Sequence, residues 1–244
     1  MNIRLKDGSS VSFDSPIKVM DVAKSISEGL ARVALGAKVD GNVVELNSVI
    51  YEDCTLEILT FKDEEGKRIY RHTCSHILAQ AMKSVFPTVK LAIGPAIDNG
   101  FYYDFDFKTA ITFEELVKVE DEMKKIIKAN YPLERFVLPR QEAINLMRSF
   151  GEDYKVELIN DLPEDVEVSF YKQGDFVDLC AGPHLPSTGY IKAFKLTSLT
   201  GAYWRGNEHN KMLSRVYGTC FDKKADLNEY LTALEEAKKR DHNK

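Results

Sequence analysis

Two pairs of side chains that could bind a metal or act in catalysis share one spacing in this sequence. His72 and His76 lie four residues apart, and so do Cys180 and His184. Residues i and i+4 of a helix project from one face about 6 Å apart, so the first pair can act together. Two histidines alone are more often held by local hydrogen bonds, but the recurrence of the spacing with a cysteine favours a shared site.

Imidazole and thiolate groups are the usual ligands of zinc, and four of them make a closed tetrahedral site. The two pairs could therefore bind zinc through His72, His76, Cys180 and His184. A zinc protease is less attractive because the helical pair lacks the intervening glutamate that would act as the base. Cys74, two residues from each histidine, would point away from them on a helix, and we expect it to pack in the core.

A carboxylate accompanies the second pair. Period-two alternation along the strand places Phe176, Asp178 and Cys180 on one face. Such a polar face indicates either a functional cluster or the exposed side of a two-layer domain. Tyr103 and Lys155 are further candidates, although tyrosines commonly pack and most lysines are solvated.

The elements that must position these residues begin with a unit at residues 1–61. Asp7-Gly8 and Asp40-Gly41 are hairpin signals, and apolar residues at helical spacing predict a helix between the two turns. The pattern predicts strands at residues 2–5, 11–13, 37–39, 43–46 and 55–60. Hairpin, helix and further strands form the order of a ubiquitin-like β-grasp, although order alone does not fix one fold.

A second and larger α+β unit is expected over residues 62–225. Its first helix should follow the charged stretch 62–67 and end before Pro87. Thr112 and Glu115 form a capping box for a second helix, and a third should end at Gly151. A hairpin is expected across Gly174.

The last segment, residues 226–244, has apolar residues at helical spacing and stops in a basic cluster without a cap. We expect a linker helix there, in a chain that is truncated.

The overall composition is that of an ordinary globular protein, with 44% hydrophobic and 29% charged residues. Four scattered cysteines do not suggest a disulfide framework. The N-terminus lacks the apolar run of a signal peptide or membrane helix, so we expect a cytoplasmic protein without membrane contact. The net charge of −5 argues against a protein that coats DNA or RNA, so any RNA contact should be local.

Five segments, in this order, make the chain similar to the threonyl-tRNA synthetase family. They are residues 71–76 (RHTCSH), 92–95 (AIGP), 98–104 (DNGFYYD), 180–184 (CAGPH) and 201–206 (GAYWRG). The paired motifs also occur in alanyl-tRNA synthetase editing domains, so the surrounding segments carry the threonyl assignment. The resemblance implies a TGS β-grasp domain at 1–61, a two-layer editing domain at 62–225, and at 226–244 the start of a linker helix toward a catalytic core that this chain lacks.

The resemblance further implies hydrolysis of serine mischarged onto threonine tRNA, at the 3′ acceptor end. His72, Lys155 and His184 would be catalytic. His72 and Lys155 would contact the water and the substrate hydroxyl, and Asp178 would pair with the substrate ammonium. Tyr103, Cys180 and His76 would complete the substrate-binding site. A histidine whose pKa is near its ordinary value of about 6.5 could act as the base.

Family resemblance implies no cofactor for editing, because alanyl-type domains carry zinc on this motif pair and threonyl-type domains use the same positions without it. ATP and a further zinc would belong to the missing core, as would dimerisation of the full-length enzyme. Trp204 and Arg205 are expected to contact the single-stranded acceptor end, although Trp204 could equally be core. The alternative function is a non-catalytic module that binds tRNA or holds a structural zinc.

Overall fold

The computed structural model describes residues 1–244, and its N-terminal part is a small mixed sheet with two helices. The strands lie in the order β2-β1-β7-β4-β5, with β1 and β7 parallel at the centre. The helices are α1 (Val19–Ile26) and α2 (Glu28–Val33); the strands are β1 (Asn2–Leu5), β2 (Ser10–Ser12), β4 (Gly36–Val39), β5 (Asn42–Val44) and β7 (Cys54–Leu59), with β3 (Ile17–Lys18) and β6 (Val49–Ile50) as a separate pair. Buried aliphatic residues such as Ile3, Val22 and Leu56 join sheet to helix. The expected β-grasp arrangement is confirmed.

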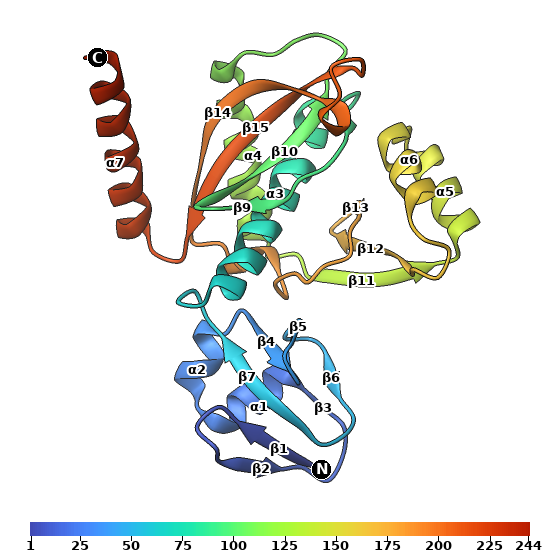
Figure 1. Ribbon diagram of the computed structural model, residues 1–244, viewed down its shortest axis with the longest axis vertical. Helices are drawn as coiled ribbons and strands as arrows, with labels where there is room; N and C mark the ends of the chain where they lie inside the picture. The colour runs from blue at the N-terminus through green and yellow to red at the C-terminus, as the bar shows by residue number, and fades with distance from the viewer.

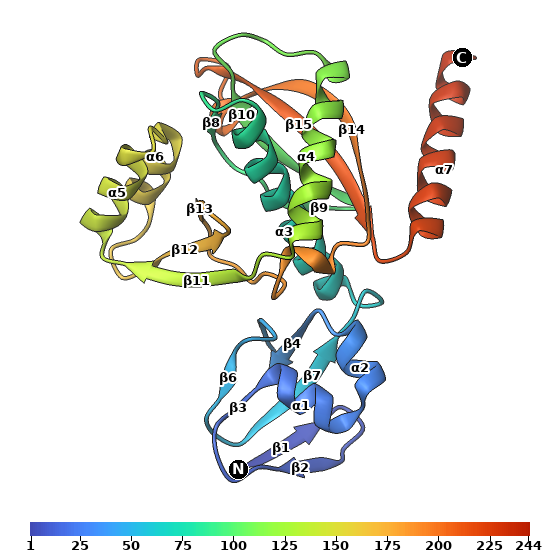
Figure 2. The same ribbon diagram turned by 180° about the vertical axis from the view of Figure 1, so that it is seen from behind.

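The main body packs two helices on one face of an antiparallel sheet (Figures 1 and 2). The helices are α3 (Glu64–Val85) and α4 (Leu116–Ala129), and the sheet order is β14-β15-β10-β8, with β9 paired to β10. These strands are β8 (Lys90–Leu91), β9 (Ala96–Ile97), β10 (Gly100–Asp106), β14 (Ala193–Tyr203) and β15 (Met212–Phe221). Their shared core holds 23 buried residues, so α3 is enclosed along most of its length. The expected two-layer α+β class is confirmed.

A smaller lobe stands beside this body (Figure 1). It has a three-stranded sheet of β11 (Leu133–Leu138), β12 (Val168–Gln173) and β13 (Phe176–Leu179), covered by α5 (Arg140–Ser149) and α6 (Asp153–Asp161). The lobe has its own core, which includes Met147, Ile159 and Phe170. The hairpin across Gly174 is confirmed. The sequence patterns did not reveal α6.

Helix ends follow the predicted signals. Both hydrogen bonds of the capping box between Thr112 and Glu115 form, at the start of the 3-10 turn η1 (Phe113–Glu115) that leads into α4. Gly151 has a φ of +71° just beyond α5, a left-handed conformation that suits glycine. Two more 3-10 turns are η2 (Thr188–Tyr190) and η3 (Trp204–Gly206).

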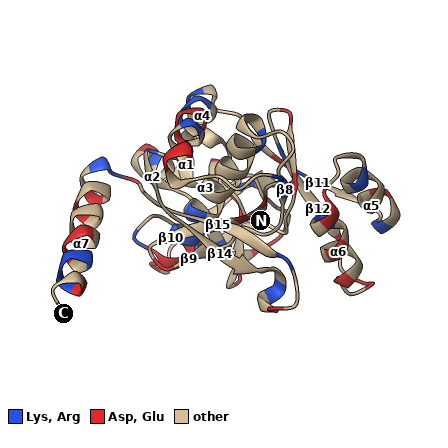
Figure 3. Cartoon of the chain, turned by 90° about the horizontal axis from the view of Figure 1, so that it is seen from above, with Lys and Arg blue, Asp and Glu red and all other residues tan.

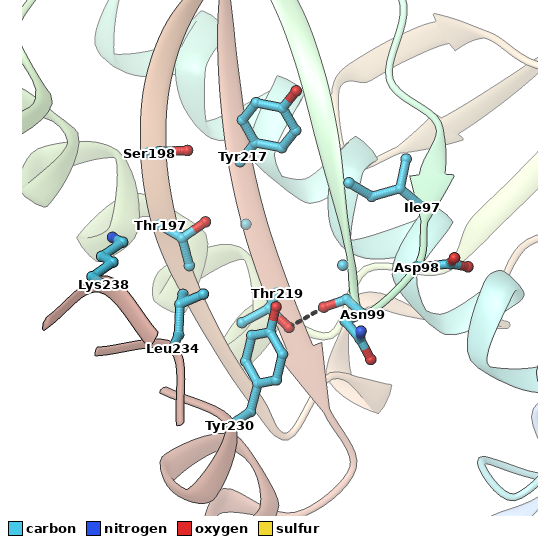
Figure 4. Close-up of a pocket in the computed structure, with 12 residues that line it drawn as sticks. Ile97, Asp98, Asn99, Thr197, Ser198, Tyr217, Thr219, Tyr230, Leu234 and Lys238 are labelled. Atoms are coloured by element: carbon cyan, nitrogen blue, oxygen red, sulfur yellow. Dashed lines mark hydrogen bonds between the residues drawn. The ribbon is translucent and has the colours of Figure 1, made fainter. Parts of the chain in front are cut away.

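The last helix, α7 (Lys224–His242), projects from the edge of the main sheet (Figure 1). Basic and acidic residues alternate along it, as Figure 3 shows. A groove of about 270 Å³ lies between this helix and the sheet, where Tyr230, Leu234 and Lys238 face Thr197 and Tyr217 (Figure 4). None of the helices combines the length and apolar character that crossing a bilayer requires.

Candidate functional site

The two histidines of the first motif lie in the middle of α3, where the helix passes through the core. His76 is buried and His72 is half-buried. The two rings meet edge to face with centroids 4.9 Å apart, as the four-residue spacing predicts. Cys74, between them in sequence, is fully buried away from the pair, which confirms its expected packing role.

The second motif lies in the loop that follows β13 and folds back onto α3. Gly182 has a φ of +75°, and a Cβ there would lie 2.1 Å from the hydroxyl oxygen of Tyr171, so only glycine fits this turn. The turn stacks the His184 ring on His72, with centroids 4.3 Å apart. Cys180 Sγ lies 3.2 Å from His184 Nε2 and 3.5 Å from His72 Nε2. We call His72, His76, Cys180 and His184 the imidazole–thiol cluster.

The cluster has the donor set of a zinc site. One donor atom from each of its four residues lies within 4.8 Å of the others. On the outer side of the rings, His184 Nδ1 lies 2.9 Å from Thr73 Oγ1, and His76 Nδ1 lies 3.2 Å from Asp178 Oδ2, although without a hydrogen bond. Oxygen partners on the outer nitrogens are typical of metal-binding histidines. The residues therefore fit tetrahedral zinc as well as a metal-free polar cluster.

A buried ion pair adjoins the cluster. Lys155 Nζ, from α6, lies 2.9 Å from Asp178 Oδ1 and donates to the Tyr103 hydroxyl at 2.8 Å. The Tyr103 hydroxyl in turn donates to Asp178 Oδ2 at 2.8 Å. All three residues are at most 3% exposed. We call Tyr103, Lys155 and Asp178 the ion-pair triad. It rules out the alternative of an exposed strand face, because Asp178 is buried.

The triad keeps its carboxylate ionised. Burial acts to raise the pKa of Asp178, but the Lys155 ammonium, together with the hydrogen bonds from Lys155 and Tyr103, outweighs it and the net pKa is lowered. Tyr103 reaches this position because Gly94 has no side chain: a Cβ there would lie 2.1 Å from the Tyr103 ring. The segment around Gly94 is therefore needed for close packing behind the site.

Burial makes the imidazoles of the cluster neutral. It lowers the pKa of His72 to about 4 and that of His76 to about 3, and it lowers the pKa of His184 well below the ordinary value. Burial also raises the pKa of the Cys180 thiol to about 12. The expectation of a histidine base near its ordinary pKa is therefore wrong for His72. A neutral imidazole of this kind can orient a water molecule by accepting a hydrogen bond from it, but it holds a proton taken from that water only weakly.

One member of the cluster, His72, borders a cavity. A cavity of about 260 Å³ reaches His72 and is lined by Val43, Glu65, Arg68, Ile69, His72, Gly182 and Pro183. Its lining is both apolar and charged. A substrate that enters here meets His72 first, because His76 and His184 lie behind it in the buried layer.

Trp204 and Arg205 lie apart from this opening, and the expected RNA contact of Trp204 needs correction. The Trp204 ring is 6% exposed and packs with Ala92 and Leu213. An indole this buried is core and cannot stack on an unpaired base without leaving its packing. The Arg205 guanidinium forms an ion pair with Asp161 at the end of α6.

Sequence reasoning missed four residues that hold the site. Thr73 and Tyr171 contact His184, and Glu45 accepts a hydrogen bond from its backbone N–H. Glu152 accepts from Lys83 Nζ at 2.6 Å and from the Leu91 N–H at 2.8 Å. Thr73 could have been found from its place between the two histidines. The other three carry no local signal, because their partners are distant in sequence.

Comparisons with known proteins agree with this architecture. Residues 1–60 match the TGS domain family, and residues 168–217 match the family described as threonyl and alanyl tRNA synthetase second additional domain. The second match includes Asp178, Cys180 and His184.

Whole-chain relatives are threonine–tRNA ligases. The proteins of that name from Acetivibrio thermocellus and Clostridium kluyveri are 63% identical over all 244 residues, and that from Clostridioides difficile is 61% identical. The chain spans 38% of the length of each relative. It is therefore similar over its whole length to the N-terminal region of bacterial threonine–tRNA ligases, with a TGS domain followed by the additional domain of threonyl- and alanyl-tRNA synthetases.

Proposed function

We propose that this chain hydrolyses the ester bond of serine wrongly attached to threonine tRNA. The observation that carries the proposal is the buried ion-pair triad next to a neutral imidazole–thiol cluster that opens at His72. Ester hydrolysis needs an oriented water, a charge or donor for the developing oxyanion, and groups that hold the substrate. The two groups of side chains together offer all three.

In the proposed reaction, a water oxygen attacks the ester carbonyl, and the bond from that carbon to the ribose oxygen breaks. His72, the cluster member at the cavity, accepts a hydrogen bond from the water through its neutral ring and so orients it. The ribose oxygen leaves with one proton of the water and becomes a hydroxyl group. The serine leaves as the free acid. The Cys180 thiol and the His184 ring form the wall behind the reacting carbon.

The triad suggests how the substrate amino group binds. Both Asp178 oxygens are already engaged, one by Lys155 and one by Tyr103. In the proposed complex, a substrate ammonium pairs with Asp178 in place of Lys155. We propose that this exchange turns Lys155 toward the substrate hydroxyl, which couples substrate binding to the placement of a catalytic cation.

A need for such a site follows from the size of the substrates. Serine lacks one methyl group of threonine, and a pocket discriminates a single such group by only about 1 to 3 kcal/mol. A second site that admits serine and excludes the methyl group corrects the remaining errors. Tight packing around Lys155 and Tyr103, both nearly inaccessible to solvent, would provide that exclusion.

We further propose that this reaction uses no metal. Should zinc bind, His72, His76, Cys180 and His184 would hold it, and it would supply Lewis-acid polarisation of the ester carbonyl. The same donor set favours the second candidate function, a module that binds tRNA and holds a structural zinc without turnover.

The test is hydrolysis of threonine tRNA charged with serine. We expect turnover by the wild-type chain and a loss of at least about 100-fold in Lys155→Ala and in His72→Ala, the order expected when a group acting in the transition state is removed. Lys90→Ala is the matched control, since Lys90 pairs with Asp153 at the start of α6 outside the site. An unchanged rate in a folded Lys155→Ala variant would remove Lys155 from the mechanism. Absence of turnover by the folded wild-type chain would favour the non-catalytic module.

A further inference from the structure

A carboxylate from the N-terminal unit reaches into the second motif. Glu45 follows β5, and its Oε1 accepts a hydrogen bond from the backbone N–H of His184 at 3.0 Å. The same oxygen accepts from the Tyr171 hydroxyl. Glu45 is half-buried, and burial raises its pKa against the opposing effect of these two donors.

These contacts fix the loop that carries His184. The Tyr171 ring packs edge to face on the His184 ring, with centroids 4.5 Å apart. Its hydroxyl occupies the space that a Cβ on Gly182 would need. Glu45 thus connects to His184 twice, directly through the backbone and indirectly through Tyr171. Loss of the carboxylate would release both connections together.

The N-terminal unit is also attached to the main body by contacts that do not involve this loop. Lys38 Nζ lies 2.8 Å from Glu65 Oε1 at the start of α3. The Ile69 side chain packs closely over Gly36, and Leu35 belongs to the large core of the main body. Removal of the Glu45 carboxylate should therefore leave the two units docked, which separates its local effect from a loss of docking.

We propose that Glu45 is a positioning residue of the hydrolytic site, by which the TGS domain holds the His184 loop against α3. This inference rests on the proposed hydrolysis and adds to it that the site is completed by a residue of the other domain. Val43, two residues earlier, lines the cavity at His72, so the same segment also forms part of the entrance.

The experiment compares Glu45→Ala, Glu45→Gln and Tyr171→Phe in the full chain, with Lys38→Ala as the matched control. We expect kcat for seryl-tRNA to fall at least about tenfold in Glu45→Ala, with KM changed by less than about threefold, because the loop shifts while the entrance persists. Glu45→Gln should recover most of kcat, since its amide oxygen can still accept from the His184 N–H. Tyr171→Phe should show an intermediate loss, and Lys38→Ala should match the wild type.

Hydrogen exchange at the His184 amide gives a readout that does not depend on activity. We expect faster exchange in Glu45→Ala and wild-type exchange in Lys38→Ala. If the wild-type chain shows no hydrolysis but this exchange pattern holds, the proposed function fails and the Glu45 contact stands. Unchanged kcat in a folded Glu45→Ala variant, or unchanged His184 exchange, would overturn the proposal. Should Glu45→Ala fail to fold, Glu45→Gln and Tyr171→Phe decide by the same measurements.

Discussion

The buried pair of Lys155 and Asp178 should dominate the stability of the region around the site. We consider Lys155→Met and Asp178→Asn, which remove one charge each while nearly keeping the shape. The charged atoms lie 2.9 Å apart. With an effective dielectric constant of about 20, their attraction is roughly 6 kcal/mol before desolvation is subtracted. Each single variant leaves the opposite charge buried without its partner, which costs about 3 to 5 kcal/mol.

The double variant removes both charges, so it should be more stable than the sum of the single losses indicates. We expect a coupling free energy of at least about 2 kcal/mol in the cycle. The assay is urea unfolding at pH 7 followed by the fluorescence of Trp204, the single tryptophan, whose ring lies 5.0 Å from that of Tyr154 on α6. Single losses below about 1 kcal/mol that simply add would refute the reasoning.

Three further predictions concern the protonation of His72, a bound metal, and the contact of Glu152 with Lys83. The pKa of His72 is about 4 in the folded chain and about 6.5 when unfolded. The neutral ring therefore contributes its stability above pH 6.5, and this contribution is lost as the pH falls toward 4, because the unfolded chain binds a proton that the folded chain does not. Urea unfolding should show the free energy of unfolding fall by roughly 2 kcal/mol between pH 7 and pH 5 from this group. A pH dependence unchanged in His72→Asn would contradict this. Dialysis against a chelator should leave seryl-tRNA hydrolysis unchanged, whereas one bound zinc per chain together with lost turnover would show that the metal takes part. Glu152→Gln should lower the free energy of unfolding by about 1 to 3 kcal/mol and lower kcat, because it removes the charge that pairs with Lys83. The control is Glu120→Gln, at the more exposed pair with Lys195. Equal losses in both variants would exclude a special role for Glu152.

Local patterns in the sequence determined much of the fold. The stripe and caps around α3, α4 and α5 depend on neighbours within a few residues, so periodicity and capping were sufficient to find them. The helix α6 escaped because its apolar residues face a small lobe core, while Lys155 turns inward against the usual exposure of lysine. Its contacts with Asp178 on β13 and with Tyr103 on β10, both distant in sequence, explain that burial.

The members of the candidate site were also named from sequence, but their states were not. The four-residue spacings indicated the imidazole–thiol cluster, and strand alternation placed Asp178 with Cys180. The depressed pKa of His72 depends on burial, and the double engagement of Asp178 depends on packing between two lobes. Glu45 lies 139 residues from His184, so no local pattern could connect them.

The central claim is a hydrolytic site that accepts serine and excludes threonine, and single-turnover deacylation tests it most directly. Threonine tRNA charged with serine or with threonine is mixed with excess wild-type chain, and the two rate constants are compared. We predict faster loss of serine by roughly 10- to 200-fold, the range that one methyl group supports. Equal rates for the two esters, or no loss of serine from a folded chain, would contradict the account.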